Sequence, residues 1–188
     1  NGSVCLHLAN TTGLSAFNNI SLTPEESLID TYVDDLDSDS RADLVFISTE
    51  GNLGVALSGP NSYSTFVNVS VPSNASGGGG GGGLGGGGGE SSILSDLVSI
   101  DIWSGMKTAA VAEETEAHVT FWNFTGSTGS FQWVKSVVEA YNLETSLQAV
   151  DMDGDGDQDL VGNAFLNGYT TAIWDGLSFS STTSETVF

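Results

Sequence analysis

The stretch AVDMDGDGDQDLVGN, residues 149–163, carries an aspartate at every second position: Asp151, Asp153, Asp155, Asp157 and Asp159. Carboxylates this close repel one another, so the segment needs either a cation or full solvation. A D-x-D-x-D-G segment curves the chain so that its first, third and fifth side chains converge, and Gly156 permits the sharp turn. Several flexible oxygen ligands are what Ca²⁺ requires. The stretch therefore predicts a calcium site; the alternative is a solvated acidic loop.

This loop differs from an EF-hand at its end. An EF-hand closes with a glutamate at its twelfth position, which here is Gly162. The loop closes earlier, at Asp159, and the apolar pair Leu160 and Val161 follows. The loop is therefore not an EF-hand and need not lie between helices.

A second copy of the pattern lies nearer the N-terminus. Residues 33–46, VDDLDSDSRADLVF, align with the first stretch without a gap and supply four matching acids: Asp35, Asp37, Asp39 and Asp43. Ser40 replaces the glycine and Arg41 replaces Asp157. With one acid fewer, this loop is predicted to bind calcium less tightly.

The residues after each loop also repeat, as a short apolar strand, a glycine turn, a second strand, a turn, and a strand that opens with phenylalanine. Residues 99–131 have the same layout, but Trp103, Gly105 and Ala109 stand where acids would be, so this middle copy is expected to lack a metal. Residues 3–22 match only the second half of a unit.

Alternating apolar and polar residues predict strands throughout. Residues 132–143 are the one stretch with some helical character, and their β-forming side chains favour a strand. We expect an all-β fold of repeated four-stranded antiparallel blade-like units, of the β-propeller type or a stacked β-repeat, with three full units plus an N-terminal half unit.

These units divide the chain. We expect a half repeat at 1–22, a calcium-loop repeat at 27–72, a degenerate repeat at 91–142 and a second calcium-loop repeat at 143–188. Residues 73–90 form a glycine-rich segment, with 12 glycines in the 13 residues 77–89. This segment is either a flexible linker or a stretch without assigned residue identities, and it lacks the lysine of a phosphate-binding loop.

The pattern D-x-D-x-D-G-x-x-D-L, followed by such strands, resembles the FG-GAP or VCBS repeat found in the β-propellers of integrin α subunits and in many secreted proteins. The resemblance covers most of the chain. It implies that aspartates one, three, five and nine of each loop coordinate calcium through their side chains. It also implies that the seventh residue, Asp157 or Arg41, contributes its backbone carbonyl.

Composition narrows the class of partner. The net charge is −21, from 24 acidic residues against three basic ones. Nucleic acid and anionic membranes both need basic partners, so neither is expected to bind. No apolar run is long enough for membrane insertion. Bound calcium would offset part of the negative charge.

Six N-x-[ST] motifs predict N-linked glycans and hence an extracellular protein, secreted or on the cell surface. They begin at Asn1, Asn10, Asn19, Asn68, Asn74 and Asn123. Asn10 and Asn123 are expected in exposed turns. The single cysteine, Cys5, excludes a disulfide within the chain and is expected to be a core residue.

Catalysis is not expected. The chain has two histidines, His7 and His118, both at predicted strand positions, and no nucleophile, zinc or dinucleotide motif. We expect a calcium-stabilised, N-glycosylated structural protein whose copies join by strand addition at the half repeat into a surface filament or matrix. The alternative is a piece of a closed propeller that serves in adhesion or binds carbohydrate, with tryptophans stacking on sugars.

Overall fold

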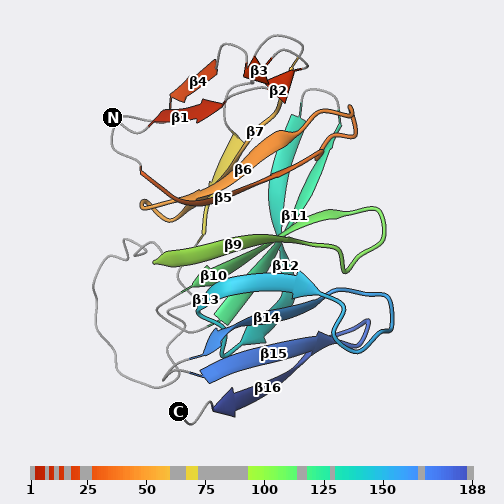
Figure 1. Cartoon of the computed structure of the whole chain (residues 1–188). Coiled ribbons are helices and arrows are strands. Elements are labelled where there is room, and N and C mark those ends of the chain that lie inside the picture. The colour runs from red at the N-terminus through yellow and green to blue at the C-terminus, as the bar shows by residue number, and fades with distance from the viewer. Residues whose placement is uncertain are drawn as a thin grey trace, which may run out of the picture.

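The computed structural model describes residues 3–6, 9–10, 13–14, 18–21, 27–59, 67–71, 93–113, 118–127, 130–164 and 168–185. All regular structure in these residues is β, and they contain no helix (Figure 1). The predicted all-β class is confirmed.

Three antiparallel sheets of four strands, blades 1 to 3, follow one another along the chain. Blade 1 consists of β5 (Leu28–Asp34), β6 (Asp43–Ser48), β7 (Asn52–Ala56) and β8 (Val67–Ser70). Blade 2 consists of β9 (Leu94–Ile100), β10 (Lys107–Glu113), β11 (His118–Ser127) and β12 (Ser130–Tyr141). Blade 3 consists of β13 (Thr145–Val150), β14 (Asp159–Ala164), β15 (Gly168–Trp174) and β16 (Phe179–Glu185). Each sheet falls within one of the predicted full repeats.

Two short ribbons precede blade 1. β1 (Ser3–Leu6) pairs with β4 (Asn18–Ser21), and β2 (Ala9–Asn10) pairs with β3 (Gly13–Leu14). The N-terminal segment thus forms antiparallel pairs of its own, separate from the four-stranded sheets. In Figure 1 these ribbons lie beyond blade 1, on the side away from blade 2.

The stretch with some helical character is a strand, as predicted. Residues 132–143 fall largely within β12, which pairs with β11 along its length. Side chains alternate across the sheet: Trp133 is 6% exposed and Val134 is 43% exposed. This period of two is that of a strand.

Two apolar clusters hold the blades together face to face. The first joins blade 1 to blade 2 and includes Val45, Ile47, Leu53, Leu97 and Trp122. The second joins blade 2 to blade 3 and includes Ala110, Phe121, Leu147, Leu160 and Trp174. Blade 2 therefore buries both of its faces, as the middle unit of a repeat stack does.

The tryptophans belong to this core and do not form a sugar-binding surface. Trp122, Trp133 and Trp174 are buried. Trp103 is half-buried and packs edge-on against Trp174 at a ring separation of 5.5 Å and against Phe121 at 6.3 Å.

Hydrogen bonds repeat between the first strands of successive blades. The backbone N–H of Leu97 donates to Asp30 across the blade 1–blade 2 boundary at 3.1 Å. The N–H of Leu147 donates to Asp96 across the next boundary at 2.6 Å. Burial and the neighbouring carboxyl of Asp30 raise the pKa of Asp96. The same type of hydrogen bond, from a backbone N–H to an aspartate of the preceding blade, thus joins both pairs of neighbouring blades.

Candidate metal centres

Both aspartate loops connect the first strand of a blade to the second. The loop of blade 1, residues 35–42, joins β5 to β6, and the loop of blade 3, residues 151–158, joins β13 to β14. In each case the closing aspartate, Asp43 or Asp159, is the first residue of the second strand. The repeat therefore places the two loops at equivalent corners of two blades.

The same backbone hydrogen bonds curl both loops. In blade 3, Asp151 accepts from Gly156 N at 3.2 Å, Asp153 from Asp155 N at 3.2 Å, and Asp155 from Asp157 N at 2.9 Å. In blade 1 the corresponding bonds have lengths of 2.9, 3.3 and 2.9 Å; they join Asp35 to Ser40, Asp37 to Asp39, and Asp39 to Arg41. Carboxylates that hold backbone N–H groups in this way are fixed in place before any ion binds.

Each closing aspartate is fully buried and bonded at both oxygens. Asp159 accepts from Met152 N at 2.7 Å and from Trp174 N at 2.8 Å. Asp43 accepts from Leu36 N at 2.9 Å and from Ser58 N at 2.7 Å. Both residues are 0% exposed. The closing aspartate thus ties the loop to the last residue of β15 in blade 3 and to Ser58, just past β7, in blade 1. The sequence pattern did not reveal this structural role.

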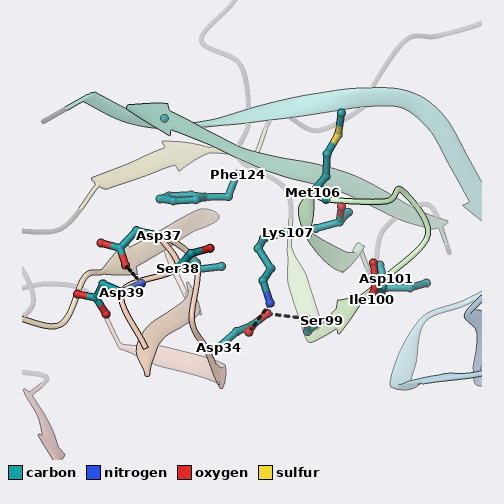
Figure 2. A pocket seen from close by; sticks show the side chains of 14 residues that line it. Asp34, Asp37, Ser38, Asp39, Ser99, Ile100, Asp101, Met106, Lys107 and Phe124 are labelled. Carbon is teal, nitrogen blue, oxygen red and sulfur yellow. Dashed lines mark hydrogen bonds and ion pairs between the residues drawn. The ribbon is translucent and has the colours of Figure 1, made fainter. Parts of the chain in front are cut away.

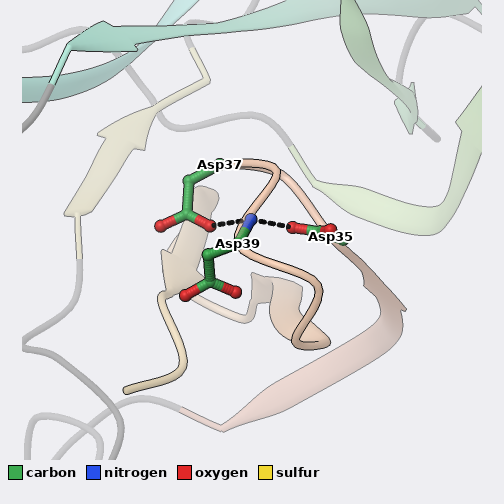
Figure 3. Close-up of side chains that lie close together, drawn as sticks. All are labelled: Asp35, Asp37 and Asp39. Carbon is green, nitrogen blue, oxygen red and sulfur yellow. Dashed lines mark hydrogen bonds between the residues drawn. The ribbon is translucent and has the colours of Figure 1, made fainter. Parts of the chain in front are cut away.

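Three carboxylates converge in each loop. Oxygens of Asp35, Asp37 and Asp39 lie within 4.8 Å of one another in blade 1 (Figure 3), as do those of Asp151, Asp153 and Asp159 in blade 3. The convergent sets therefore differ: Asp43 is outside the first and Asp155 outside the second. A cluster whose donor atoms are all oxygens fits a hard cation such as Ca²⁺.

The two loops also differ in the residue types at their left-handed positions and in local charge. The fourth and sixth residues have a left-handed backbone in both loops, with φ of 82° at Gly154 and 100° at Gly156, against 62° at Ser38 and 68° at Ser40. The guanidinium of Arg41 forms an ion pair with Asp39. Blade 1 thus places serines where the backbone favours glycine, and a cationic side chain on one carboxylate of its cluster.

Burial raises the pKa of Asp43, although the N–H groups of Ser58 and Leu36 counter this effect. A nearby cation favours the ionised form of a carboxyl. Calcium in this loop would therefore offset part of the cost of burying Asp43.

The loop of blade 2 differs from the expected layout, in which Ala109 stood at the closing position. Asp34 pairs with Asp43 and Val150 with Asp159, but Ile100 pairs with Thr108. The connection is therefore one residue shorter, 101–107, and Thr108 instead of Ala109 takes the closing place. The Thr108 hydroxyl donates to Asn123 Oδ1 at 2.9 Å. Thr108 thus contacts the third strand through a side chain, whereas the closing aspartates of the other two blades accept from backbone N–H groups.

A cavity of about 880 Å³ opens between the loop of blade 1 and blade 2 (Figure 2). Asp37, Asp39, Met106 and Phe124 are among the residues that line it. Lys107 crosses it to Asp34, with Nζ 2.8 Å from the carboxylate. At the next boundary, Gln158 accepts a hydrogen bond from Asp101 N at 2.7 Å. Lys107 and Gln158 each directly precede the closing residue of their loop, and the side chain of each contacts the preceding blade. Lys107 thus joins blade 2 to blade 1, as Gln158 joins blade 3 to blade 2.

Among the six predicted glycosylation sites, Asn123 is the one whose side chain the structure describes. Asn1 and Asn74 lie outside the described residues, as do the side chains of Asn10, Asn19 and Asn68. Asn123 was expected in an exposed turn, but it is half-buried within β11, where Thr108 bonds it. That placement was wrong because the strand extends further than its sequence suggested.

Of the two histidines and the cysteine, His118 is the one whose side chain the structure describes. His118 is buried, 3.5 Å from Glu113, and stacks on Tyr141. His7 lies outside the described residues, as do the glycine-rich segment 77–89 and the side chain of Cys5. No described helix is long and apolar enough to cross a membrane.

No protein-family model, curated protein or solved structure matches this chain.

Proposed function

We propose that this protein is an extracellular structural protein, stabilised by calcium and N-glycosylated, whose copies assemble into a surface filament or matrix. The observation that carries the calcium part is the convergence of three carboxylates in each of two equivalent loops. Asp151, Asp153, Asp155 and Asp159, with the carbonyl of Asp157, would hold the ion in blade 3. Asp35, Asp37, Asp39 and Asp43, with the carbonyl of Arg41, would hold it in blade 1.

A structural role for the ion follows from where the loops sit. Each loop joins two strands and is tied through its closing aspartate to the third. An ion held there would crosslink three strands of one blade and neutralise carboxylates that otherwise repel one another. No catalytic step is proposed.

Calorimetric titration with Ca²⁺ tests this proposal directly. We expect two binding events in the wild-type protein and one in Asp153→Ala, because this substitution removes a converging carboxylate. Asp157→Ala is the matched control: it removes an exposed acid from the same loop and keeps the backbone carbonyl. The assigned ligands would be contradicted if the wild-type protein bound no calcium, or if Asp153→Ala and Asp157→Ala lost calcium binding equally.

Assembly is supported by the N-terminal ribbon. Among the described strands, β1 and β4 pair only with each other, so each has one edge open to a strand of another copy. Strand addition would satisfy those backbone groups. The contact would be heterologous and would propagate.

A specific observation favours the second candidate, a closed propeller used in adhesion or carbohydrate binding. Successive blades pack through their first strands with the same aspartate bond, as neighbours in a ring would. Electron microscopy of the native material separates the two candidates, since filaments extend in one direction and rings are discrete particles of fixed diameter.

A further inference from the structure

The cavity between blade 1 and blade 2 combines a buried apolar wall with a polar rim. Its volume of about 880 Å³ is typical of sites that hold small organic molecules. Leu36, Ile100 and Phe124 supply the apolar wall, and their side chains are 7%, 2% and 8% exposed. They come from both blades and belong to the two apolar clusters, so core packing fixes the wall. A ligand in this cavity would remove apolar surface from water against a rigid support.

Among the residues that line the cavity, Lys107 is the one cation, and it is already paired. Its Nζ lies 2.8 Å from Asp34 Oδ1. The Ser99 hydroxyl also donates to Asp34, at 3.4 Å from Oδ2. The carboxylate of Asp34 thus compensates the charge of Lys107 within the protein. An anionic ligand would have to displace Asp34 before it could pair with Lys107.

The remaining charged groups of the cavity wall are carboxylates. Asp37 and Asp39 come from the loop of blade 1, and Asp101 comes from the loop of blade 2. Asp39 is paired with Arg41, whereas Asp37 accepts a hydrogen bond from the N–H of Asp39 at 3.3 Å and so keeps its full negative charge. The cavity therefore repels anions and attracts cations.

An aromatic ring faces this carboxylate. Figure 2 shows the ring of Phe124 on the side of the cavity opposite Asp37. The ring is held edge-on against Trp133, at a centroid separation of 5.2 Å. A positive charge between a carboxylate and the face of an aromatic ring is attracted by both. The cavity thus offers one place for a cation and an apolar wall for the body that carries it.

We propose that this cavity binds a small organic ammonium ion. Its charged group lies between Asp37 and the ring of Phe124, and its hydrocarbon body lies along the apolar wall towards Ile100 and Met106. The class of ligand follows from the wall: an inorganic cation would leave the apolar part in contact with water, and a neutral molecule would leave Asp37 without a counter-charge.

Asp37 also belongs to the cluster that is proposed to hold calcium in blade 1. Calcium and the ammonium ion would share this carboxylate, so each should weaken the binding of the other by the same factor. The blade 3 cluster of Asp151, Asp153 and Asp159 contributes no residue to the cavity, so its affinity for calcium should not change. This coupling, unlike the cavity itself, rests on the proposed calcium sites.

The test is an NMR titration of the full-length chain in chelator with n-hexylammonium. The matched ligands are n-hexanol, which has the same body without the charge, and hexanoate, which has the opposite charge. We expect hexylammonium to shift the backbone amide signals of Gly105 and Gly126, which line the cavity. Its Kd should be about tenfold lower than that of hexanol, because one carboxylate and one ring each contribute. Hexanoate should bind more weakly than hexanol.

Two substitutions separate the contribution of the charge from that of the ring. Asp37→Asn removes the charge and keeps an oxygen acceptor for the N–H of Asp39. Phe124→Leu removes the ring and keeps an apolar side chain. Each should reduce the preference for hexylammonium over hexanol to about threefold or less, because one of the two attractions remains. Glu50→Gln, at an exposed acid in the turn between β6 and β7, should keep the wild-type preference.

Several results would overturn the ammonium site. These are no binding of hexylammonium, equal affinity for hexylammonium and hexanol, shifts confined to residues away from the cavity, or an Asp37→Asn variant with the wild-type preference. Asp37→Asn decides the question even if Phe124→Leu does not fold.

A second titration, in saturating Ca²⁺, tests the coupling. We expect weaker binding of hexylammonium than in chelator, and a calcium affinity of the blade 1 site that falls by the same factor when hexylammonium is present. Calcium that binds at both sites without changing the Kd of hexylammonium would refute the shared use of Asp37. A chain that binds no calcium would refute the proposed calcium sites, and the titration in chelator would still decide whether the cavity binds an ammonium ion.

Discussion

The loops of blade 1 and blade 3 share a hydrogen-bonded frame but differ in what surrounds it. Blade 3 has glycines at both left-handed positions and an acid at the seventh position, whereas blade 1 has Ser38, Ser40 and Arg41. Three bonds from backbone N–H groups to carboxylates are nevertheless shared, although the first aspartate also accepts from position five in blade 1 and from position four in blade 3. The frame therefore follows the aspartate spacing, whereas the residues at the left-handed positions and the local charge differ between the loops.

Blade 2 extends the comparison. It has the same four strands with a shorter loop, and Thr108 in place of a closing aspartate. A blade can therefore form without the acidic loop.

Removal of a closing aspartate should have the largest effect. Asp159→Ala would leave the N–H groups of Met152 and Trp174 without their acceptor. We expect a loss of roughly 2–6 kcal/mol in the free energy of unfolding, at about 1–3 kcal/mol per buried group. Urea denaturation measures this. Asp43→Ala should cost a similar amount, because Asp43 makes the same two bonds in blade 1. If the closing-aspartate variants lost less free energy of unfolding than the exposed control Asp157→Ala, the hydrogen bonds of the closing aspartate would not stabilise the fold.

Calcium removal should come next. At a calcium concentration of 100 times Kd, each site adds about 2.7 kcal/mol, so a chelator should lower the Tm by several degrees. Asp153→Ala should remove more of this gain than Asp37→Ala, because the blade 3 loop has more acids and no paired arginine. An unchanged Tm in chelator would contradict calcium stabilisation.

The ion pair in blade 1 offers a way to narrow this difference. Arg41→Gln frees the Asp39 carboxylate from a competing cation. Calorimetry should then show tighter calcium binding at the weaker site and an unchanged stronger site. Affinity that falls instead would mean that the arginine side chain helps to order the loop.

Backbone strain should produce a smaller effect. Gly156→Ala places a Cβ on a residue with φ of 100°, for a cost of about 1–2 kcal/mol in the free energy of unfolding. The reverse change in blade 1, Ser40→Gly, removes strain but also loosens the unfolded chain, so the net change should be within about 0.5 kcal/mol. In thermal melts, the Tm of Gly156→Ala should therefore fall by more than the Tm of Ser40→Gly changes. Equal and opposite shifts would contradict this account.

The smallest effect concerns pH at the blade 1–blade 2 boundary. The pKa of Asp96 is raised by burial and by Asp30, so its protonation favours the folded state. This contribution is missing at neutral pH and grows as the pH falls through the raised pKa. Asp96→Asn, which resembles the protonated form, should flatten the dependence of the urea midpoint on pH between about 7 and the normal carboxyl range. Asp101→Asn, at an exposed acid, should leave that dependence like wild type.

The sequence by itself determined the all-β class, the repeat and the positions of both acidic loops. Alternating side chains specify strands locally. Hydrogen bonds between residues at most five positions apart curl both loops, and in blade 1 they accompany the convergence of the aspartates at one, three and five. These features depend on neighbouring residues, so a pattern in the sequence is enough to find them.

Only the tertiary structure decided the rest. The pairing of Ile100 with Thr108, the burial of Asp43 and Asp159, and the half-buried position of Asn123 all depend on strand register. The bond from Trp174 to Asp159 spans 15 residues, and that from Leu97 to Asp30 spans 67. No local pattern encodes these bonds, because each arises only when strands or blades have packed and their backbone groups must find partners away from water.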